Sequence, residues 1–223
     1  MRRVNIMRNH TATHLLHAQL HAIVGEHARQ AGSLVAPDRL RFDFTHPDAL
    51  TQDQLDTIEA GVNREILAAH PLAIKEKSLK AAMQEGAMAL FGEKYGETVR
   101  TVTIDEKAPI SYELCGGTHV GETGDIGTFI ILSEGSTASG IRRIEAVTGR
   151  KAYEIIQQRL KALKRTALVL NTNLEEVVAR AEGLVSEIDQ DRKQIQRLRQ
   201  EMAGLEFSEL LVKANMVQGS AVL

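Results

Sequence analysis

A row of histidines near the start of the chain restricts its fold more than any other feature. His10, His14, His17 and His21 are separated by four, three and four residues. On an α-helix this spacing places the four side chains within about a 60° arc of one face. Two histidines one turn apart can direct their ring nitrogens to one divalent ion. The row therefore predicts a helix that carries a candidate metal site, although a single pair of this kind is weak evidence by itself.

A second group of metal-binding residue types follows much later in the chain. The segment CGGTH at residues 115–119 contains the only cysteine and comes directly after a predicted strand. Its two consecutive glycines let the backbone turn sharply and approach other groups closely. Two imidazoles from a helix, His10 and His14, and a sulfur–nitrogen pair from a loop, Cys115 and His119, form a donor set suited to tetrahedral zinc. The alternative is a simply buried thiol beside a histidine that caps a turn, which leaves the helical pair unexplained.

The remaining histidines are not expected to bind metal. His17 and His21 lie one and two turns beyond the predicted pair, so exposure or hydrogen bonding is the expected role for both. His27, His46 and His70 have no partner at a useful spacing and are expected at the surface or in turns.

Two familiar zinc-binding classes fit the pattern poorly. A metalloprotease helix of this type carries glutamate as the second residue of its motif, where it acts as general base, and here that position is Thr11. The ligand pairs of a zinc finger lie close together in sequence and organise a very small domain. Here they are separated by most of a globular core, so both classes are set aside.

The sequence up to Gly149 predicts an α+β domain with a mixed sheet and packed helices. A helix that begins near Met7 has Asn9 as a candidate cap and Gly32 as a candidate end, and a second helix has a capping box at Thr51 and Gln54. The segment 133–140 is rich in small polar residues and is predicted to be a mobile loop. The predicted helices span 7–30 and 51–69, and the predicted strands span 40–44, 72–74, 101–104, 110–114, 127–132 and 141–147.

The pattern changes after Gly149, where we place a domain boundary. A helix is predicted over 150–169, and Thr172 with Glu175 resembles a capping box that starts another helix. Apolar residues then recur every three or four positions and form a heptad seam, with Asp191 in one of its positions. The seam is predicted either to pack on the preceding helix as a hairpin or to pair between molecules. Its members are Leu174, Val177, Ala181, Leu184, Ile188, Ile195, Leu198, Met202 and Leu205.

Composition indicates an ordinary globular protein in a reducing compartment. The net charge is −2, so contact with a nucleic acid must come from local patches, such as the basic segment 139–165, which can equally be a solvated helix face. A single cysteine rules out an internal disulfide. No apolar run is long enough to cross a membrane, and the expected location is the cytoplasm.

Several motifs together resemble a known family. They are HTATHLLHAQL, GSLV with LRFDF, GAMALFGEKYG, ELCGGTHV, TGDIG and GIRRIEAVTG, and they look like the editing domain of alanyl-tRNA synthetases. The resemblance covers about residues 9–149, and the helices that follow resemble the segment linking editing to the C-terminal domain. It implies an editing domain at 1–149, a helical hairpin at 150–213 and the truncated start of a C-terminal region at 214–223. No aminoacylation domain is recognisable, and a freestanding editing protein is the nearest alternative.

The resemblance implies a zinc-dependent deacylase that hydrolyses serine or glycine from mischarged tRNA-Ala. His10, His14 and Cys115 would hold the zinc, with His119 as a fourth ligand or a hydrogen-bonding partner. Three ligands would leave a place for an activated water, whereas four would make a closed site. The resemblance also implies that Thr13, Gln30 and Thr118 line the amino-acid pocket. Arg142 and Arg143 lie on the predicted strand after the small-residue segment and are expected near the RNA phosphates.

Two other classes of function stay open. The first is a structural zinc module that binds tRNA without hydrolysis. The second is an interaction protein that works through the heptad seam, including pairing between copies of the chain.

Overall fold

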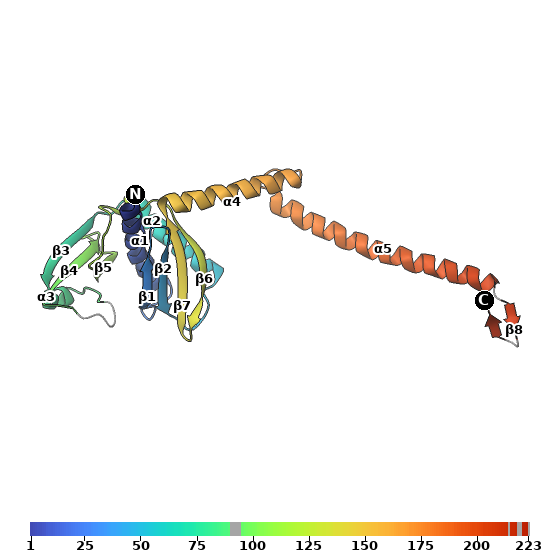
Figure 1. Ribbon diagram of the computed structural model, residues 1–223, viewed down its shortest axis with the longest axis horizontal. Helices are drawn as coiled ribbons and strands as arrows, with labels where there is room; N and C mark the ends of the chain where they lie inside the picture. Colours follow the sequence, from blue (N-terminus) through green and yellow to red (C-terminus); the bar gives the residue numbers. More distant parts are fainter. Residues whose placement is uncertain (90–94, 214, 218–219, 223) are drawn as a thin grey trace. The chain divides into compact units, whose positions relative to one another are not determined.

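The computed structural model describes residues 1–89, 95–213, 215–217 and 220–222 (Figure 1). The chain divides into two compact units, Met1–Gln157 and Gln158–Leu223. Residues 90–94 of the motif GAMALFGEKYG lie outside the described residues, as do parts of the predicted region 214–223. The elements of the first unit are α1 (Arg2–Ile23), β1 (Gln30–Val35), β2 (Leu40–Thr45), α2 (Gln52–Leu67), β3 (Leu72–Ser78), α3 (Leu79–Gln84), β4 (Thr98–Ile104), β5 (Ser111–Leu114), the 3-10 helix η1 (Thr123–Ile126), β6 (Phe129–Ala138), β7 (Ile141–Thr148) and the start of α4 (Gly149–Val169).

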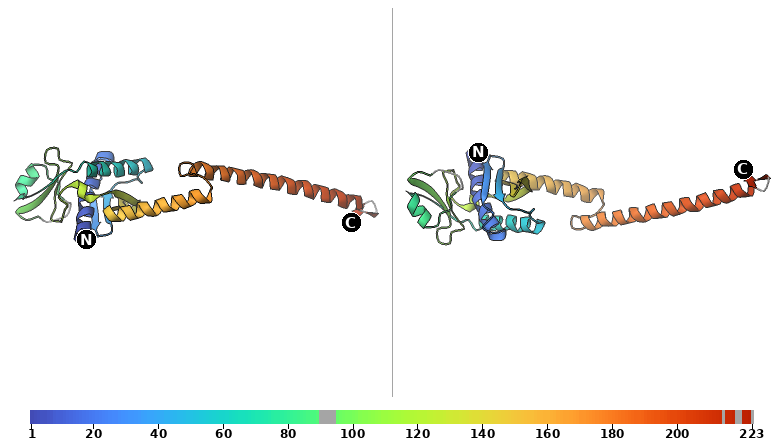
Figure 2. Two further views of the ribbon diagram at one scale, coloured as in Figure 1. Left: turned by 90° about the horizontal axis from the view of Figure 1, so that it is seen from above. Right: turned by 90° about the horizontal axis from the view of Figure 1, so that it is seen from below.

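The first unit contains two sheets with α1 between them (Figures 1 and 2). One sheet has the strand order β1-β2-β7-β6 and the other the order β3-β4-β5. The α+β class is confirmed. The pairings between the strands of both sheets are antiparallel, where a mixed sheet was expected. Because α1 contacts strands of both sheets, its side chains can meet residues from distant parts of the sequence.

The largest core lies where α1 and α2 cover the four-stranded sheet. Leu16 and Leu20 of α1 and Phe42 and Phe44 of β2 are fully buried in this core. The alternation of Phe42 and Phe44 was the signal that predicted a half-buried strand at 40–44, and that strand is confirmed. On α1, His14 and His17 instead face the carboxylate of a residue in β5.

The second helix confirms its predicted start. The side chain of Thr51 accepts a hydrogen bond from the backbone of Gln54, and the side chain of Gln54 accepts one from the backbone of Thr51. Further along α2, Asn63 exchanges hydrogen bonds with the backbone of Phe129 in β6. The capping box therefore sets where α2 begins, and Asn63 fixes the helix against the sheet.

The predicted limits of the first helix were wrong. α1 begins at Arg2 and ends at Ile23, because Gly25 adopts a φ of +119°, which favours glycine and ends the helical backbone. Asn9 is not a cap: its buried side chain donates to the carbonyl of Ala36 and accepts from the hydroxyl of Thr148, both at 2.7 Å. Residues 24–29, which were expected to complete the helix, form a turn, and strand β1, which the sequence pattern did not indicate, begins at Gln30.

The predicted loop at 133–140 was also wrong. β6 continues as strand to Ala138 and pairs with β7 through two register irregularities. A paired strand satisfies the backbone groups of these small polar residues, and Glu134 forms a two-point ion pair with Arg142 across the ladder. The interactions with the neighbouring strand therefore override the loop-like composition.

The second unit is dominated by one long helix. It contains the rest of α4, helix α5 (Val177–Lys213) and the strands β8 (Asn215–Val217) and β9 (Ser220–Val222). The predicted capping box was misplaced: Thr172 contacts the side chain of Glu176, and Asn173 accepts a hydrogen bond from the backbone of Glu176. Among the residues described, no helix is long and apolar enough to cross a bilayer.

The heptad seam is only partly covered. Val177 is buried and Leu184 half-buried, but Ile188 and Ile195 are 48% and 50% exposed, and Leu205 is 68% exposed. The later part of the seam is therefore exposed, and the packing of the whole seam as a hairpin stays a prediction. Whether it pairs between molecules stays a prediction.

Candidate metal centre

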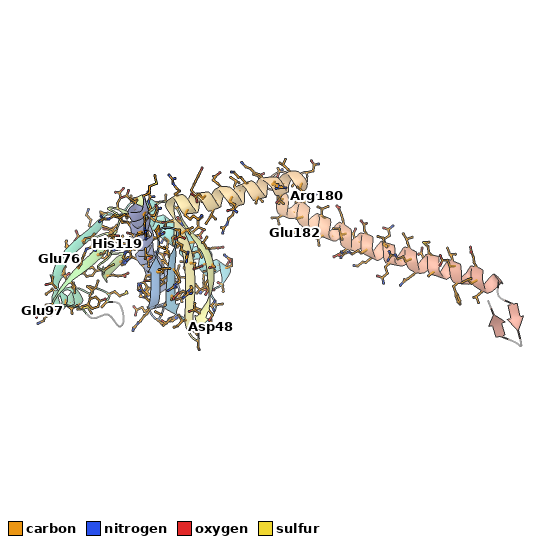
Figure 3. All side chains as sticks on the ribbon, in the orientation of Figure 1. Asp48, Glu76, Glu97, His119, Arg180 and Glu182 are labelled. Atoms are coloured by element: carbon orange, nitrogen blue, oxygen red, sulfur yellow. The ribbon has the colours of Figure 1, made fainter. Side chains whose placement is uncertain are left out.

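The structure brings His10, His14, Cys115 and His119 together, as the sequence predicted. One nitrogen or sulfur atom from each side chain lies within 4.8 Å of the others. The sulfur of Cys115 is 3.4 Å from Nε2 of His10 and 3.4 Å from Nε2 of His119. α1 supplies two of these side chains, and the loop after β5 supplies the other two; Figure 3 labels His119. We call these four residues the donor cluster.

The surroundings of two members of the donor cluster, Cys115 and His119, favour the protonation states that bind metal. Burial opposes ionisation of Cys115, but hydrogen bonds from His10, His119 and His14 outweigh it and lower the pKa of the thiol to about 3. Burial lowers the pKa of His119 to about 4. At neutral pH the cluster therefore presents a thiolate and a neutral imidazole, which are the forms that bind metal.

The loop after β5 reaches the helix because it has glycine at one contact. A Cβ on Gly117 would lie 1.9 Å from Cε1 of His10, whereas a Cβ on Gly116 would meet nothing within 4 Å. Arg100 of β4 donates to the carbonyls of Cys115 and Gly117 and so holds the loop from the other side. Gly117 is thus required for close approach to His10, and Gly116 is not.

Thr11 has a role that the sequence analysis did not assign. Its hydroxyl oxygen lies 3.1 Å from Nδ1 of His119 and accepts a hydrogen bond from the backbone of Val120 at 3.3 Å. With Nδ1–H of His119 directed to Thr11, Nε2 of the same ring presents its lone pair to the cluster. The residue that replaces the metalloprotease glutamate therefore orients a candidate ligand.

Glu113 is the functional residue that the sequence analysis missed. Its carboxylate lies 2.9 Å from Nδ1 of His14, although without full hydrogen-bond alignment, and 3.5 Å from Nδ1 of His17. Burial alone would lower the pKa of His14, but Glu113 and then Cys115 outweigh it and raise this pKa to about 10. Alternation along a strand places residue 113 on the same face as residue 115, which was the available signal.

A small cavity beside the donor cluster, which we call the inner cavity, contains two of the predicted pocket residues. Its volume is about 40 Å³, and its lining includes Thr13, Gln30 and Ser33. Thr13 donates its hydroxyl proton to the carbonyl of Asn9 at 2.8 Å, which leaves its oxygen free to accept. Thr118 is exposed, and the cavity linings defined by the described residues do not include it.

A larger cavity of about 480 Å³ opens on the other side of Cys115 and His10. Arg100, Ser33 and Gly117 are among its lining residues. Because Ser33, His10 and Cys115 line both spaces, the two cavities adjoin at the cluster. A molecule can therefore place a small group in the inner cavity and a larger one outside it.

The two arginines expected near RNA are already paired. Arg142 makes a two-point ion pair with Glu134 at 2.5 and 2.6 Å, and Arg143 makes one with Asp43 at 2.6 and 2.8 Å. These carboxylates offset the charge that a phosphate would meet. Their role in binding RNA stays a prediction.

The donor set fits zinc. Three imidazoles and one thiolate are preferred zinc ligands, and the second nitrogens of His14 and His119 face a carboxylate and a hydroxyl, as is usual around metal-bound histidine. The backbone of Gly117 also lies so close to the ring of His10 that a Cβ would not fit, which keeps the loop next to the helix at the cluster. The four residues could hold one ion.

Comparisons with known proteins agree with this description. Residues 99–145 match the family model described as the threonyl and alanyl tRNA synthetase second additional domain. The alanine–tRNA ligase of Alkaliphilus oremlandii is 49% identical over 99% of this chain and 25% of its own length. That of Halorhodospira halophila is 48% identical over 96% of this chain and 24% of its own length.

The similarity extends to other alanine–tRNA ligases. That of Thermus thermophilus is 50% identical over 89% of this chain and 23% of its own length. The chain thus spans about a quarter of the length of these relatives. The chain is therefore a homologue of one segment of alanine–tRNA ligases, a segment that includes the second additional domain of threonyl and alanyl tRNA synthetases.

Proposed function

We propose that the chain is the editing part of an alanyl-tRNA synthetase and hydrolyses the ester of tRNA-Ala that carries serine or glycine. The observation that supports this most is the donor cluster beside an inner cavity of about 40 Å³ lined by Thr13 and Gln30. Such a cavity is large enough for a small aminoacyl side chain and too small for a bulky one. On this proposal residues 1–149 are the editing domain and 150–213 the linker to a C-terminal region.

Editing has a physical motive. An aminoacylation pocket that accepts alanine cannot exclude the smaller glycine, and it rejects one added hydroxyl by only about a hundredfold. A second site must then bind what distinguishes serine from alanine. The oxygen of Thr13 can accept the serine hydroxyl proton, because its own proton is donated to Asn9. The side chain of Gln30, which donates to Ser33 at 3.3 Å, retains its carbonyl oxygen as a second acceptor.

The zinc held by His10, His14, Cys115 and His119 would supply Lewis acidity beside the ester. The residues around it perform the positioning. Thr11 and Glu113 orient His119 and His14, and Arg100 holds the loop carbonyls in place. The larger cavity on the other side of Cys115 would receive the terminal ribose, so that the ester bond lies at the cluster.

The partner on this proposal is the acceptor end of tRNA-Ala in the cytoplasm. Because Arg142 and Arg143 are paired to carboxylates, we expect them to add little to phosphate binding unless those pairs open. Arg100 lines the larger cavity and is the better placed cation. The exposed part of the heptad seam, from Ile188 to Leu205, would serve for pairing between copies of the chain.

A structural metal module that binds tRNA is the second candidate. It is favoured by the four potential ligands, since four protein ligands are typical of a structural zinc site. In this case the ester would persist on a bound tRNA.

The test is incubation of the zinc-loaded chain with Ser-tRNA-Ala and, separately, with Ala-tRNA-Ala. We expect the serine ester to disappear faster than in buffer, while the alanine ester persists. Cys115→Ala should abolish the difference, and His46→Ala, a histidine away from the cluster, should not. Binding of tRNA with an unchanged serine ester would instead support the structural module.

A further inference from the structure

His17 and His21 form a second nitrogen-donor pair outside the donor cluster. They lie one turn apart on α1, and their ring centroids are 4.4 Å apart. Nε2 of each ring is buried, and the residues that the structure describes give neither of these atoms a hydrogen-bond partner. His17 itself is only 3% exposed. A buried polar atom without a partner is costly, so two of them side by side need an explanation.

The contacts on the other side of each ring indicate which ring nitrogen carries the lone pair. Nδ1 of His17 faces the carboxylate of Glu113 at 3.5 Å, and His21 interacts on its other side with the backbone of Ala28. A neutral ring whose Nδ1–H is directed at an acceptor carries its lone pair on Nε2. Burial, and then the neighbouring His17, lower the pKa of His21, which keeps this ring neutral at pH 7. Nε2 of His21 is therefore an acceptor, and the tautomer of His17 that directs Nδ1–H to Glu113 has its lone pair on Nε2 as well.

The side chains of His17 and His21 also border a cavity. The volume of this cavity is about 340 Å³, and its lining also includes Glu26, Arg29 and Gln30. Two imidazole lone pairs at helical spacing, each oriented by a carboxylate or backbone group behind it, are the arrangement that metal-binding histidines show. Glu26, an exposed carboxylate in the same lining, offers an oxygen donor, and its charge offsets that of Arg29.

We propose that the Nε2 atoms of His17 and His21 bind a second divalent transition-metal ion in this cavity, with water or Glu26 completing its coordination. The proposal does not depend on the editing function. Only two imidazoles are fixed in place, so this second site is weaker than the donor cluster. It shares Glu113 with the cluster, since that carboxylate faces both His14 and His17.

Cobalt(II) titration of the metal-free chain tests the proposal, because the two sites differ in ligand type. We expect about two equivalents to bind. The first should show a thiolate-to-cobalt charge-transfer band from Cys115, and the second should change the visible spectrum without increasing this band. His21→Ala should bind one equivalent and retain the charge-transfer band, which also shows that the variant is folded. His21→Gln, which keeps a polar side chain, should behave in the same way.

The matched control is His46→Ala. His46 also lies beside another histidine, His27, at 2.9 Å between ring nitrogens, but that pair is at the surface. This variant should still bind both equivalents. The proposal is overturned if the wild-type chain binds only one equivalent, if His46→Ala loses the second, or if both substitutions of His21 retain it.

Discussion

Glu113 and His14 are held 2.9 Å apart in the interior, with the carboxylate of Glu113 on Nδ1 and the other nitrogen of His14 left for the donor cluster. The carboxylate comes from β5, and the imidazole comes from α1. The contact therefore ties α1, which supplies two candidate ligands, to the strand that precedes the loop with the other two. It also favours the ring orientation that metal binding requires, because an acceptor at Nδ1 leaves Nε2 as the ligand atom.

Replacing Glu113 by glutamine should weaken metal binding. The amide keeps the shape but loses the charge that orients and polarises His14, and loss of such a partner typically reduces metal affinity about 10–100-fold. Competition with a chromogenic chelator measures the change. Glu85→Gln, which alters an exposed carboxylate paired with Lys77 and Tyr112, should retain the wild-type affinity. Equal affinities for the wild type and Glu113→Gln would show that Glu113 does not support the ligand.

Gly117→Ala should disrupt the cluster, and Gly116→Ala should not. The added Cβ at residue 117 would lie 1.9 Å from Cε1 of His10 and must displace either the ring or the loop, whereas the space at residue 116 is open. We expect Gly117→Ala to bind less than one equivalent of zinc after dialysis, measured by elemental analysis, and Gly116→Ala to match the wild type. If both variants hold zinc equally, His10 is not needed for binding.

The sequence alone predicted the residues of the donor cluster, because each half of the cluster has a local sequence pattern. Helical spacing identified His10 and His14, and the glycines identified a loop able to bring Cys115 to them. The sequence did not predict the role of Glu113, because that role depends on which strand lies against α1. The same limit explains β6: the composition of 133–140 indicated a loop, but pairing with β7 supplies the hydrogen bonds that keep it extended.

The thiol of Cys115 should react as a thiolate at mildly acidic pH when the metal is removed. Hydrogen bonds from the surrounding histidines outweigh burial and lower its pKa to about 3, so the ionised fraction stays near one down to about pH 5. We expect the rate of alkylation by iodoacetamide to be nearly constant between about pH 5 and 8. In the urea-unfolded chain the rate should fall about tenfold per pH unit over the same range. Zinc should protect the folded chain, and a steep pH dependence in the folded metal-free chain would contradict the assignment.

The metal-free chain should lose stability on acidification below pH 6.5. The folded pKa values of Cys115, about 3, and His119, about 4, lie below their ordinary values of 9.0 and 6.5. The pKa of Glu113 is also lowered, because His14 and His17 outweigh the effect of burial. The unfolded chain therefore binds more protons between pH 6.5 and 4, and the free energy of unfolding falls as the pH falls. His14, whose pKa is raised to about 10, contributes stability that is lost as the pH rises through that value. Urea midpoints across this range measure the effect, and Cys115→Ser should show a shallower acid limb.

Thr13→Val tests whether the inner cavity selects the serine hydroxyl. Valine has nearly the same shape as threonine, but it removes the oxygen that we expect to accept the serine proton. Loss of one hydrogen bond of this kind should lower kcat/KM for Ser-tRNA-Ala by about tenfold. Hydrolysis of Gly-tRNA-Ala provides the internal control, since glycine has no hydroxyl to lose. General damage to the site would slow both reactions equally, and equal losses for the two substrates would remove Thr13 from the discrimination.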